Sequence, residues 1–347
     1  MMEKDILEIC GLKKSFGEKK VLRGVDFSVP ENSVFGFIGR NGAGKTTTMK
    51  SVLGLLKPDS GEIRVCGETV TYGQTKTNRF IGYLPDVPEF YPFMTAKEYL
   101  KLCGQISGMS ASEIKSRSEE LLELVGLGNE KHRIKGYSRG MKQRLGIAQA
   151  LMGRPKLLIC DEPTSALDPV GRKEILEILL AARAQTSVLF STHILSDVEK
   201  ICDHVALLEG GKIVAVGTMD EVRGMHADPG IEIVLKDLAD EERIRKAFPN
   251  VIKRYDDRKK GYTENVKKHP ETSKDNNRRI KSGKTDLHAT KESSGDNYFQ
   301  GTLYIKNVSD DTAGKILEFL AKEHIPIIRF ERKEADLEEM FMEFIGE

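Results

Sequence analysis

A glycine-rich segment, Gly39–Thr46, constrains the fold of this chain more than any other feature. It reads G-R-N-G-A-G-K-T and fits the pattern G-x-x-x-x-G-K-[ST]. The apolar, β-rich run Val34–Ile38 precedes it, and a helical pattern over Lys45–Leu56 follows, up to the turn residues Lys57–Gly61. A strand, a glycine loop and a helix in this order predict a phosphate-binding loop, because backbone N–H groups and the positive end of the helix dipole face the phosphate.

This loop predicts the residues of a nucleotide site. Lys45 is expected to reach the β- and γ-phosphates, and the Thr46 hydroxyl is expected to bind Mg²⁺. A glycine turn without a ligand is the competing interpretation, which the strand and helix on either side disfavour. The residues expected to contact the nucleotide here are Gly39, Arg40, Asn41, Gly42, Ala43, Gly44, Lys45, Thr46 and Thr47.

Two adjacent carboxylates follow a second buried-strand candidate. The apolar run Leu157–Cys160 ends at Asp161 and Glu162. Adjacent residues of a strand point to opposite sides, so we expect the two acids to serve different purposes. Asp161 is suited to the Mg²⁺ shell, and Glu162 is suited to polarise the water that attacks the γ-phosphate. A solvated strand end or a helix cap is the alternative interpretation of the pair.

The segments Gly39–Thr47 and Asp161–Pro169 together resemble the ATP-binding cassette (ABC) ATPases, specifically the nucleotide-binding subunits of transporters. The resemblance covers residues 5 to about 220, in the order expected for the family. Tyr137–Arg144 resembles the family's signature motif, and Ser165–Asp168 resembles the loop that passes messages between two sites. The resemblance implies an Mg²⁺-dependent ATPase with ATP and Mg²⁺ as cofactors.

The signature-like segment also has a physical interpretation of its own. The residues after Ser138 follow a helical pattern to about Met152, so Ser138 is expected to be the N-cap of a helix. A helix start with a free hydroxyl and unpaired N–H groups can bind an anion. The resemblance implies that Ser138 and Gly140 contact the γ-phosphate of a nucleotide bound to a second subunit.

Two isolated residues receive their roles mainly from the resemblance. His193 follows the apolar run Ser187–Phe190 and resembles the family's switch histidine, which donates a hydrogen bond to the γ-phosphate. His193 thereby joins Lys45 and Glu162 as a predicted catalytic residue. Phe16 resembles the aromatic residue that stacks on adenine, although an aromatic before a glycine is commonly only a core or turn residue.

The chain departs from the family pattern at two places. Asp86 stands where the family normally has a glutamine that approaches the nucleotide and Mg²⁺. Aspartate is shorter and charged, so its expected contact with the metal requires a bridging water molecule. Arg139 and Met141 stand where the usual signature has glycine and glutamine, and the retained Ser138 and Gly140 are expected to preserve the phosphate contact.

The resemblance implies that ATP lies between the phosphate loop of one subunit and the signature helix of another, so a chain with one set of motifs is expected to form a homodimer or to pair with a related second ATPase. No stretch approaches the ~18 uninterrupted apolar residues of a membrane span, so separate integral-membrane permease subunits are expected as partners. Tyr137–Met141, Tyr83–Pro88 and Asp336–Phe341 resemble the corresponding segments of ABC-2-type exporter ATPases. The resemblance therefore predicts an export ATPase, cytoplasmic and peripheral on the inner face of the cell membrane.

Two other functional classes stay open. One is a soluble ABC ATPase that acts on ribosomes or DNA, although such relatives usually carry two cassettes or a long coiled coil between the motifs. The other is an ATP-sensing regulatory module without turnover, against which the presence of Glu162 and His193 speaks. The 54 basic and 53 acidic residues leave a formal charge of +1, so no nucleic-acid partner is expected.

The order of strands and helices predicts two domains. Residues 1–224 are expected to form an α/β ABC nucleotide-binding domain of the P-loop ATPase fold, with a helical subdomain over about 88–155. Residues 225–347 are expected to form a small α+β accessory domain with a ferredoxin-like order of elements and a terminal helix. Within it, residues 255–297 are rich in Lys, Asp, Asn and Ser, and are predicted to be a disordered insertion.

Overall fold

The computed structural model describes residues 4–225, 230–237, 239–248, 301–305 and 308–333. Its contacts divide the chain into two units, with residues 4–225 in unit 1 and residues 230–333 in unit 2. The predicted domain boundary after residue 224 falls beside the undescribed residues 226–229. The predicted insertion 255–297 and the exporter-like tail 336–341 with its terminal helix lie outside the described residues.

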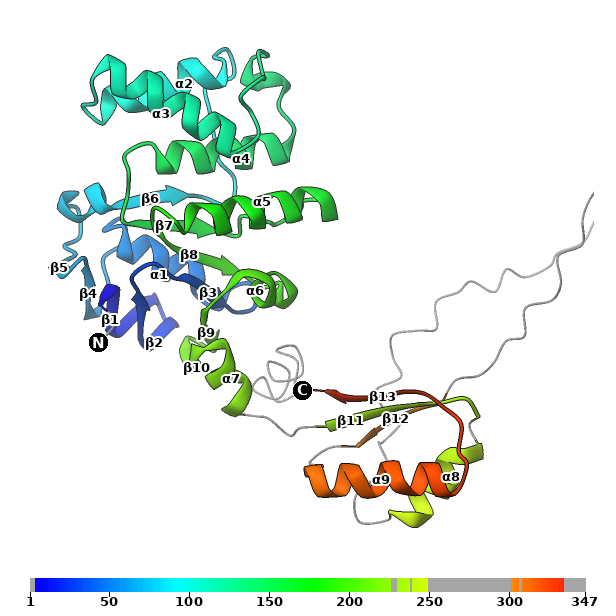
Figure 1. The fold of residues 1–347 in the computed structure, drawn as a ribbon. Helices are drawn as coiled ribbons and strands as arrows, with labels where there is room; N and C mark the ends of the chain where they lie inside the picture. Colours follow the sequence, from blue (N-terminus) through cyan, green and yellow to red (C-terminus); the bar gives the residue numbers. More distant parts are fainter. Residues whose placement is uncertain (1–3, 226–229, 238, 249–300, 306–307, 334–347) are drawn as a thin grey trace, which may run out of the picture. The chain divides into compact units, whose positions relative to one another are not determined.

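A six-stranded sheet is the frame of unit 1 (Figure 1). Its strands, in spatial order, are β10 (Lys212–Thr218), β9 (His204–Glu209), β3 (Val34–Ile38), β8 (Ser187–Thr192), β7 (Leu157–Asp161) and β6 (Ile81–Leu84). The strands β9 to β6 run parallel, and β10 pairs antiparallel with β9. Every residue of β3, β7 and β8 is buried, as expected for central strands covered on both faces. These three strands confirm the apolar runs predicted from the sequence.

A second, antiparallel sheet encloses the core of unit 1. Its strands, in spatial order, are β2 (Lys19–Pro30), β1 (Asp5–Phe16), β4 (Ser60–Val65) and β5 (Glu68–Thr69). The rings of Phe27 on β2 and Phe35 on β3 stack with centroids 5.5 Å apart, and Phe37 lies 5.1 Å from Phe27. The same buried cluster includes Met49 and Val52 of α1 (Lys45–Val52), so this helix is fixed between the sheets.

The helix after the glycine loop is shorter than predicted. α1 ends at Val52, whereas the sequence pattern extended it to Leu56. Gly54 adopts a left-handed conformation (φ 68°) and its N–H donates to Ser51 O, a geometry that ends a helix. The turn at Lys57–Gly61, which had set the predicted end, lies beyond this stop.

Three helices lie within residues 88–155, the range predicted to form a helical subdomain: α2 (Ala96–Ile106), α3 (Ala111–Leu124) and α4 (Arg139–Leu151). Thr95 and Ser110 begin α2 and α3 with capping boxes, in which side chain and backbone exchange hydrogen bonds. Figure 1 shows the three helices together at the β6 side of the sheet. The remaining helical segments of unit 1 are η1 (Lys76–Phe80), η2 (Ile134–Gly136), α5 (Pro169–Ala182), α6 (Leu195–Ile201) and α7 (Met219–Met225).

In its described residues, unit 2 contains a three-stranded antiparallel sheet and two helices. Its elements, in chain order, are β11 (Gly230–Leu235), α8 (Ala239–Ala247), β12 (Gly301–Ile305), α9 (Asp310–Lys322) and β13 (Ile327–Lys333). β11 lies between β12 and β13, and Ile231 and Ile233 pack with Ile316 and Leu320 of α9. A ferredoxin-like unit needs one more strand between α8 and β12. That strand would fall within the undescribed residues, so the ferredoxin-like topology stays a prediction.

Candidate functional site

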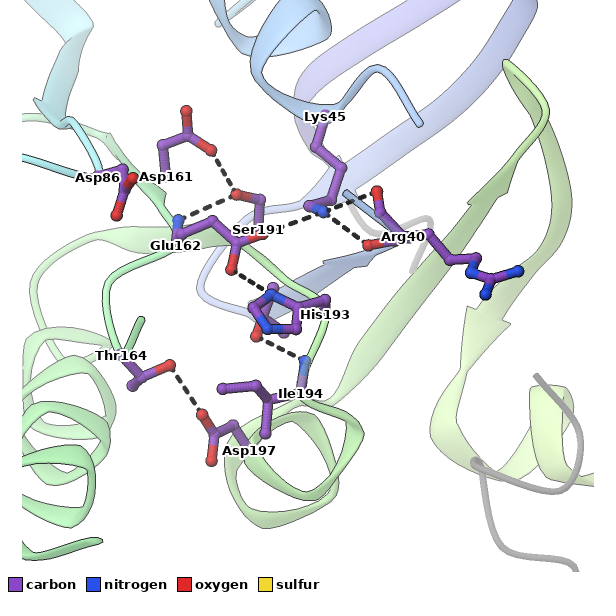
Figure 2. Close-up of polar contacts among 12 residues, drawn as sticks. Arg40, Lys45, Asp86, Asp161, Glu162, Thr164, Ser191, His193, Ile194 and Asp197 are labelled. Atoms are coloured by element: carbon purple, nitrogen blue, oxygen red, sulfur yellow. Dashed lines mark hydrogen bonds and ion pairs between the residues drawn. The ribbon is translucent and has the colours of Figure 1, made fainter. Parts of the chain in front are cut away.

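Three neighbouring parallel strands bring the predicted site residues to one edge of the sheet. β8 lies between β3 and β7, with Thr192 paired to Ile38 and Ser191 paired to Asp161. The carboxyl ends of the three strands therefore lie side by side, and each continues into a predicted motif. Ligands of open α/β sheets bind outside the carboxyl ends of the strands. Figure 2 shows the polar contacts at this edge.

The glycine loop adopts backbone conformations that favour glycine. Gly42 has φ 85° and Gly44 has φ 117°, and Gly44 is the N-cap of α1. A Cβ atom at Gly44 would lie 2.6 Å from Cδ2 of the buried Leu22, so a larger residue requires the Leu22 side chain to shift. The loop thus turns closely into the start of α1, where free N–H groups and the helix dipole suit the phosphates of a nucleotide.

Lys45 joins this loop to the acidic pair. Its ammonium donates to Gly39 O at 2.6 Å and to Arg40 O at 3.3 Å. The same Nζ lies 3.0 Å from Oε1 of Glu162, and the Lys45 side chain is only 5% exposed. The positive charge is therefore held at the loop by surrounding oxygens (Figure 2).

Asp161 is buried next to the first helical turn. Its Oδ2 accepts a hydrogen bond from Thr46 Oγ1 at 2.7 Å, and its Oδ1 accepts one from Ser191 Oγ at 2.7 Å. A hydroxyl and a carboxylate side by side are the hard oxygen ligands that Mg²⁺ prefers, with substrate phosphates supplying the rest. The described residues hold no cluster of three or more His, Cys, Asp or Glu side chains suited to a metal. The residues present fit an Mg²⁺ ion shared with phosphate oxygens.

Glu162 faces two cationic or hydrogen-bonding groups at once. Its Oε1 meets Lys45, and its Oε2 lies 2.9 Å from Nδ1 of His193. The backbone of Glu162 has φ 49°, a left-handed conformation that costs a non-glycine residue about 1–2 kcal/mol. Its N–H donates to both Ser191 O and Ser191 Oγ at 3.1 Å, which holds this strained conformation. Lys45, Glu162 and His193 thus form one connected group (Figure 2).

Asp86 lies against the signature-like helix. Its Oδ1 is 3.4 Å from the Arg139 guanidinium, and its backbone oxygen accepts a 2.6 Å hydrogen bond from Gln143 Nε2. Burial raises the pKa of the Asp86 carboxyl, Arg139 opposes this, and the charges of Asp161 and Glu162 raise it further. Asp86 is therefore in contact with Arg139, which belongs to the second departure from the family pattern.

The remaining predicted residues contact other parts of unit 1. Ser138 is the N-cap of α4, as predicted, and its Oγ accepts a 3.2 Å hydrogen bond from Met141 N. Gly140 lies in the first turn of this helix. Phe16 ends β1 with 51% of its surface exposed, and Lys14 Nζ lies 5.4 Å from its ring centroid. In the contacts of the described residues, these three stand apart from the group around Lys45 and Glu162.

Sequence reasoning missed the polar residues that support this group. Ser191 bridges Asp161 and the Glu162 backbone, and Asp197 accepts hydrogen bonds from Thr164 Oγ1 and from Arg172, both at 2.8 Å. Ser191 and Asp197 are both 0% exposed. The available signal was a polar residue ending an apolar strand, Ser191 after Phe190, because a buried hydroxyl requires a partner.

Comparisons with known proteins point to one family. A family model described as ABC transporter matches residues 22–165. The uncharacterized ABC transporter ATP-binding protein YxlF of Bacillus subtilis is 46% identical over 219 residues, which is 63% of this chain and 72% of that protein. The bacitracin transport ATP-binding protein BcrA of Bacillus licheniformis is 41% identical over 221 residues, or 63% and 71% of the two chains. A solved structure of the ATP binding subunit of an ABC transporter has a TM-score of 0.57 and 34% identity, covering 63% of this chain and 92% of that chain.

The family match includes both the glycine loop and the acidic pair, the two segments joined by Lys45 and Glu162. The helices of the described residues offer no apolar stretch of the length that a bilayer span requires. On its motifs, its fold and its relatives, the chain belongs to the ATP-binding proteins of ABC transporters, the ATPases that power transport.

Proposed function

We propose that ATP binds at the carboxyl edge of β3, β8 and β7 and is hydrolysed there, with Lys45, Glu162 and His193 as catalytic residues. The observation that carries this proposal is the position of the Glu162 carboxylate, with one oxygen 3.0 Å from Lys45 and the other 2.9 Å from His193. A base that is held by two neighbours within the site is oriented before the substrate arrives.

Each residue of the site has a distinct part in the hydrolysis. The loop amides and Lys45 hold the β- and γ-phosphates, and Glu162 polarises the water that attacks the γ-phosphorus. The bond from that phosphorus to the bridging oxygen breaks, which gives ADP and phosphate. His193 orients Glu162 and donates a hydrogen bond to the γ-phosphate. Thr46 and Asp161 would hold Mg²⁺, which when bound neutralises charge on the phosphate oxygens, and Asp86 would reach it through a water molecule.

A second subunit completes the site in this proposal. Ser138 and Gly140 at the start of α4 would contact the γ-phosphate held by the other subunit, because a helix start offers free N–H groups to an anion. The chain carries one set of motifs, so two copies or a related ATPase are required. Phe16, which is half-exposed, would stack on the adenine ring.

The face around Asp86 is the proposed contact with membrane permease subunits. A cavity of about 460 Å³ lies there, lined among others by residues 86–90 and by Arg139 and Lys142 of α4. Val87, Tyr91 and Phe93 lie in the same segment with more than half of their surface exposed. Exposed apolar side chains gathered beside a cavity favour a protein partner. Through such subunits the protein would lie at the inner face of the membrane and power export, as the resemblance to ABC-2-type exporters suggests.

The substitution Glu162→Gln tests the catalytic assignment. It keeps the shape of the side chain and removes the charge, so ATP binding is expected to persist while kcat falls about 10²-fold or more. Size-exclusion chromatography with ATP is expected to show a trapped dimer. Glu177→Gln, an exposed change on α5, is the matched control and should hydrolyse ATP as the unmodified protein does. A Glu162→Gln protein with unchanged kcat would remove Glu162 from the chemistry.

A further inference from the structure

A buried carboxylate on α6 joins segments that carry the site. Asp197 is 0% exposed and uses both of its oxygens. Its Oδ2 accepts a 2.8 Å hydrogen bond from Thr164 Oγ1, and its Oδ1 accepts one of 2.8 Å from the Arg172 guanidinium. Thr164 is itself only 1% exposed, so its hydroxyl is shielded from water. Figure 2 shows the bond from Thr164 to Asp197 beside the contact between Glu162 and His193.

The contact between Glu162 and His193 and the hydrogen bond between Thr164 and Asp197 connect the same two stretches of chain. Thr164 lies two residues after Glu162, and Asp197 lies four residues after His193. Glu162 meets His193 at 2.9 Å, while Thr164 meets Asp197 at 2.8 Å. The stretches 162–164 and 193–197 therefore form a closed ring that is bonded at both ends. A ring of this kind limits how far Glu162 and His193 can move apart.

The backbone between His193 and Asp197 is short and is held by local hydrogen bonds. Asp197 N donates to Ile194 O at 3.2 Å, and Ile194 N donates to Thr192 Oγ1 at 3.0 Å. The backbone from His193 to Asp197 is thus held by its own hydrogen bonds. A displacement of Asp197 is expected to move His193 with it.

Arg172 lowers the energetic cost of burying the Asp197 carboxylate, and it is not part of the ring. A buried charge without a partner is strongly unfavourable, and the guanidinium supplies the opposite charge. Arg172 belongs to the first turn of α5, where its N–H donates to Asp168 O. Because Arg172 and Thr164 bind different oxygens of Asp197, one bond can be removed while the other stays.

We propose that Asp197 is a positioning residue of the ATPase: through Thr164 it keeps His193 in contact with Glu162. Asp197 itself touches neither of these two side chains in the contacts of the described residues. The positioning role rests on the function proposed above for Glu162 and His193. It adds a residue on which the geometry of the site depends and which lies outside the family motifs matched in the sequence.

The substitution Thr164→Val removes only the hydroxyl that binds Asp197 and keeps the size and branching of the side chain. In the full chain, kcat for ATP hydrolysis is expected to fall about tenfold, with KM for ATP changed less than about twofold. Thr164→Ser retains the hydroxyl and is expected to restore kcat. The matched control is Thr186→Val, since Thr186 is also buried but directly precedes β8, at the end of that strand opposite to the site. If valine prevents folding, Thr164→Ala removes the same hydroxyl.

Repeating Thr164→Val in the His193→Ala protein distinguishes a positioning role from a general loss of structure. If Asp197 acts through His193, Thr164→Val is expected to change kcat less than about twofold once His193→Ala is present. A tenfold effect in both backgrounds would contradict the proposal. Hydrogen exchange without nucleotide gives an independent reading: amides of residues 192–202 are expected to exchange faster in Thr164→Val than in Thr186→Val. Equal exchange in the two variants would also contradict it.

The outcomes separate this proposal from the one on which it rests. If Glu162→Gln and His193→Ala both hydrolyse ATP at the unmodified rate, the proposed catalytic roles are wrong. If both of these variants are slow and Thr164→Val keeps the unmodified kcat, the catalytic roles stand and the positioning role of Asp197 is wrong.

Discussion

Replacing Gly44 with alanine tests the geometry of the glycine loop directly. Gly44 has φ 117°, far from the conformations open to alanine, so the backbone alone is expected to cost about 1–2 kcal/mol. The new Cβ would lie 2.6 Å from Leu22 Cδ2 and 3.4 Å from Val21 O, and Leu22 is itself buried. Overfilling of a core adds about 1–3 kcal/mol. Together, Gly44→Ala is expected to destabilise unit 1 by about 2–5 kcal/mol.

Two further glycines separate the backbone effect from the packing effect. Gly42 also has a positive φ (85°), but a Cβ there meets nothing within 4 Å, so Gly42→Ala should cost only about 1–2 kcal/mol. Gly153 has neither a positive φ nor a close neighbour, and Gly153→Ala should change stability by no more than about 0.5 kcal/mol. Urea unfolding followed by circular dichroism gives the three values. If Gly44→Ala costs no more than Gly42→Ala, the close approach of Leu22 to the loop is irrelevant to stability and the packing argument fails.

Two other substitutions test one charge at the site and one buried charge in α3, away from the site. Lys45→Ala removes a charged hydrogen bond to phosphate worth about 1.5–3 kcal/mol, so titration calorimetry should find ATP affinity lowered roughly 10- to 150-fold; unchanged affinity would refute the phosphate-loop assignment. Arg117→Met removes a guanidinium that is 2% exposed and donates to Gln185 Oε1 at 2.9 Å, so urea unfolding should show a loss of at least about 2 kcal/mol. The control for Arg117→Met is Lys115→Met, an exposed change on α3, the helix that also carries Arg117. This control should alter the free energy of unfolding little.

The central strands β3, β7 and β8 could be predicted because strands that are buried on both faces consist largely of consecutive apolar residues. β3, β7 and β8 are buried on both faces, so runs such as Val34–Ile38 carry no alternation and stand out from the chain. The antiparallel strands β1 and β2 gave a weaker signal, since they mix buried residues with exposed lysines such as Lys13 and Lys20. The end of α1 was misjudged because Gly54, a single residue within an apolar stretch, stops the helix before the stronger turn signal.

Several of the residues that lie together at the site could be predicted from the sequence, whereas their hydrogen bonds could not. The sequence suggested that Asp161 and Glu162 serve different purposes because neighbours on a strand point apart. In the structure β7 ends at Asp161 and Glu162 has φ 49°, so strand alternation is not what separates the two side chains. The partners are far away in the chain: Thr46 binds Asp161 across 115 residues, and no local pattern encodes this pairing. The left-handed backbone of Glu162 is likewise imposed by its surroundings, through the two hydrogen bonds to Ser191.

Asp86 and Arg139 also show that contacts between residues far apart in the chain cannot be predicted from local sequence patterns. In the sequence, Asp86 and Arg139 are separate anomalies, the first suggesting a weaker metal contact and the second an added charge. In the structure, the Arg139 guanidinium lies 3.4 Å from the Asp86 carboxylate. Burial is the main cause that raises the pKa of the Asp86 carboxyl, and the charges of Asp161 and Glu162 add to it, so an uncompensated carboxylate would add repulsion to a site that already holds two acids. Arg139 offsets that repulsion. The aspartate and the arginine are therefore neighbours joined by an exposed pair worth about 0–1 kcal/mol, and the effect of either on turnover is best measured with the other in place.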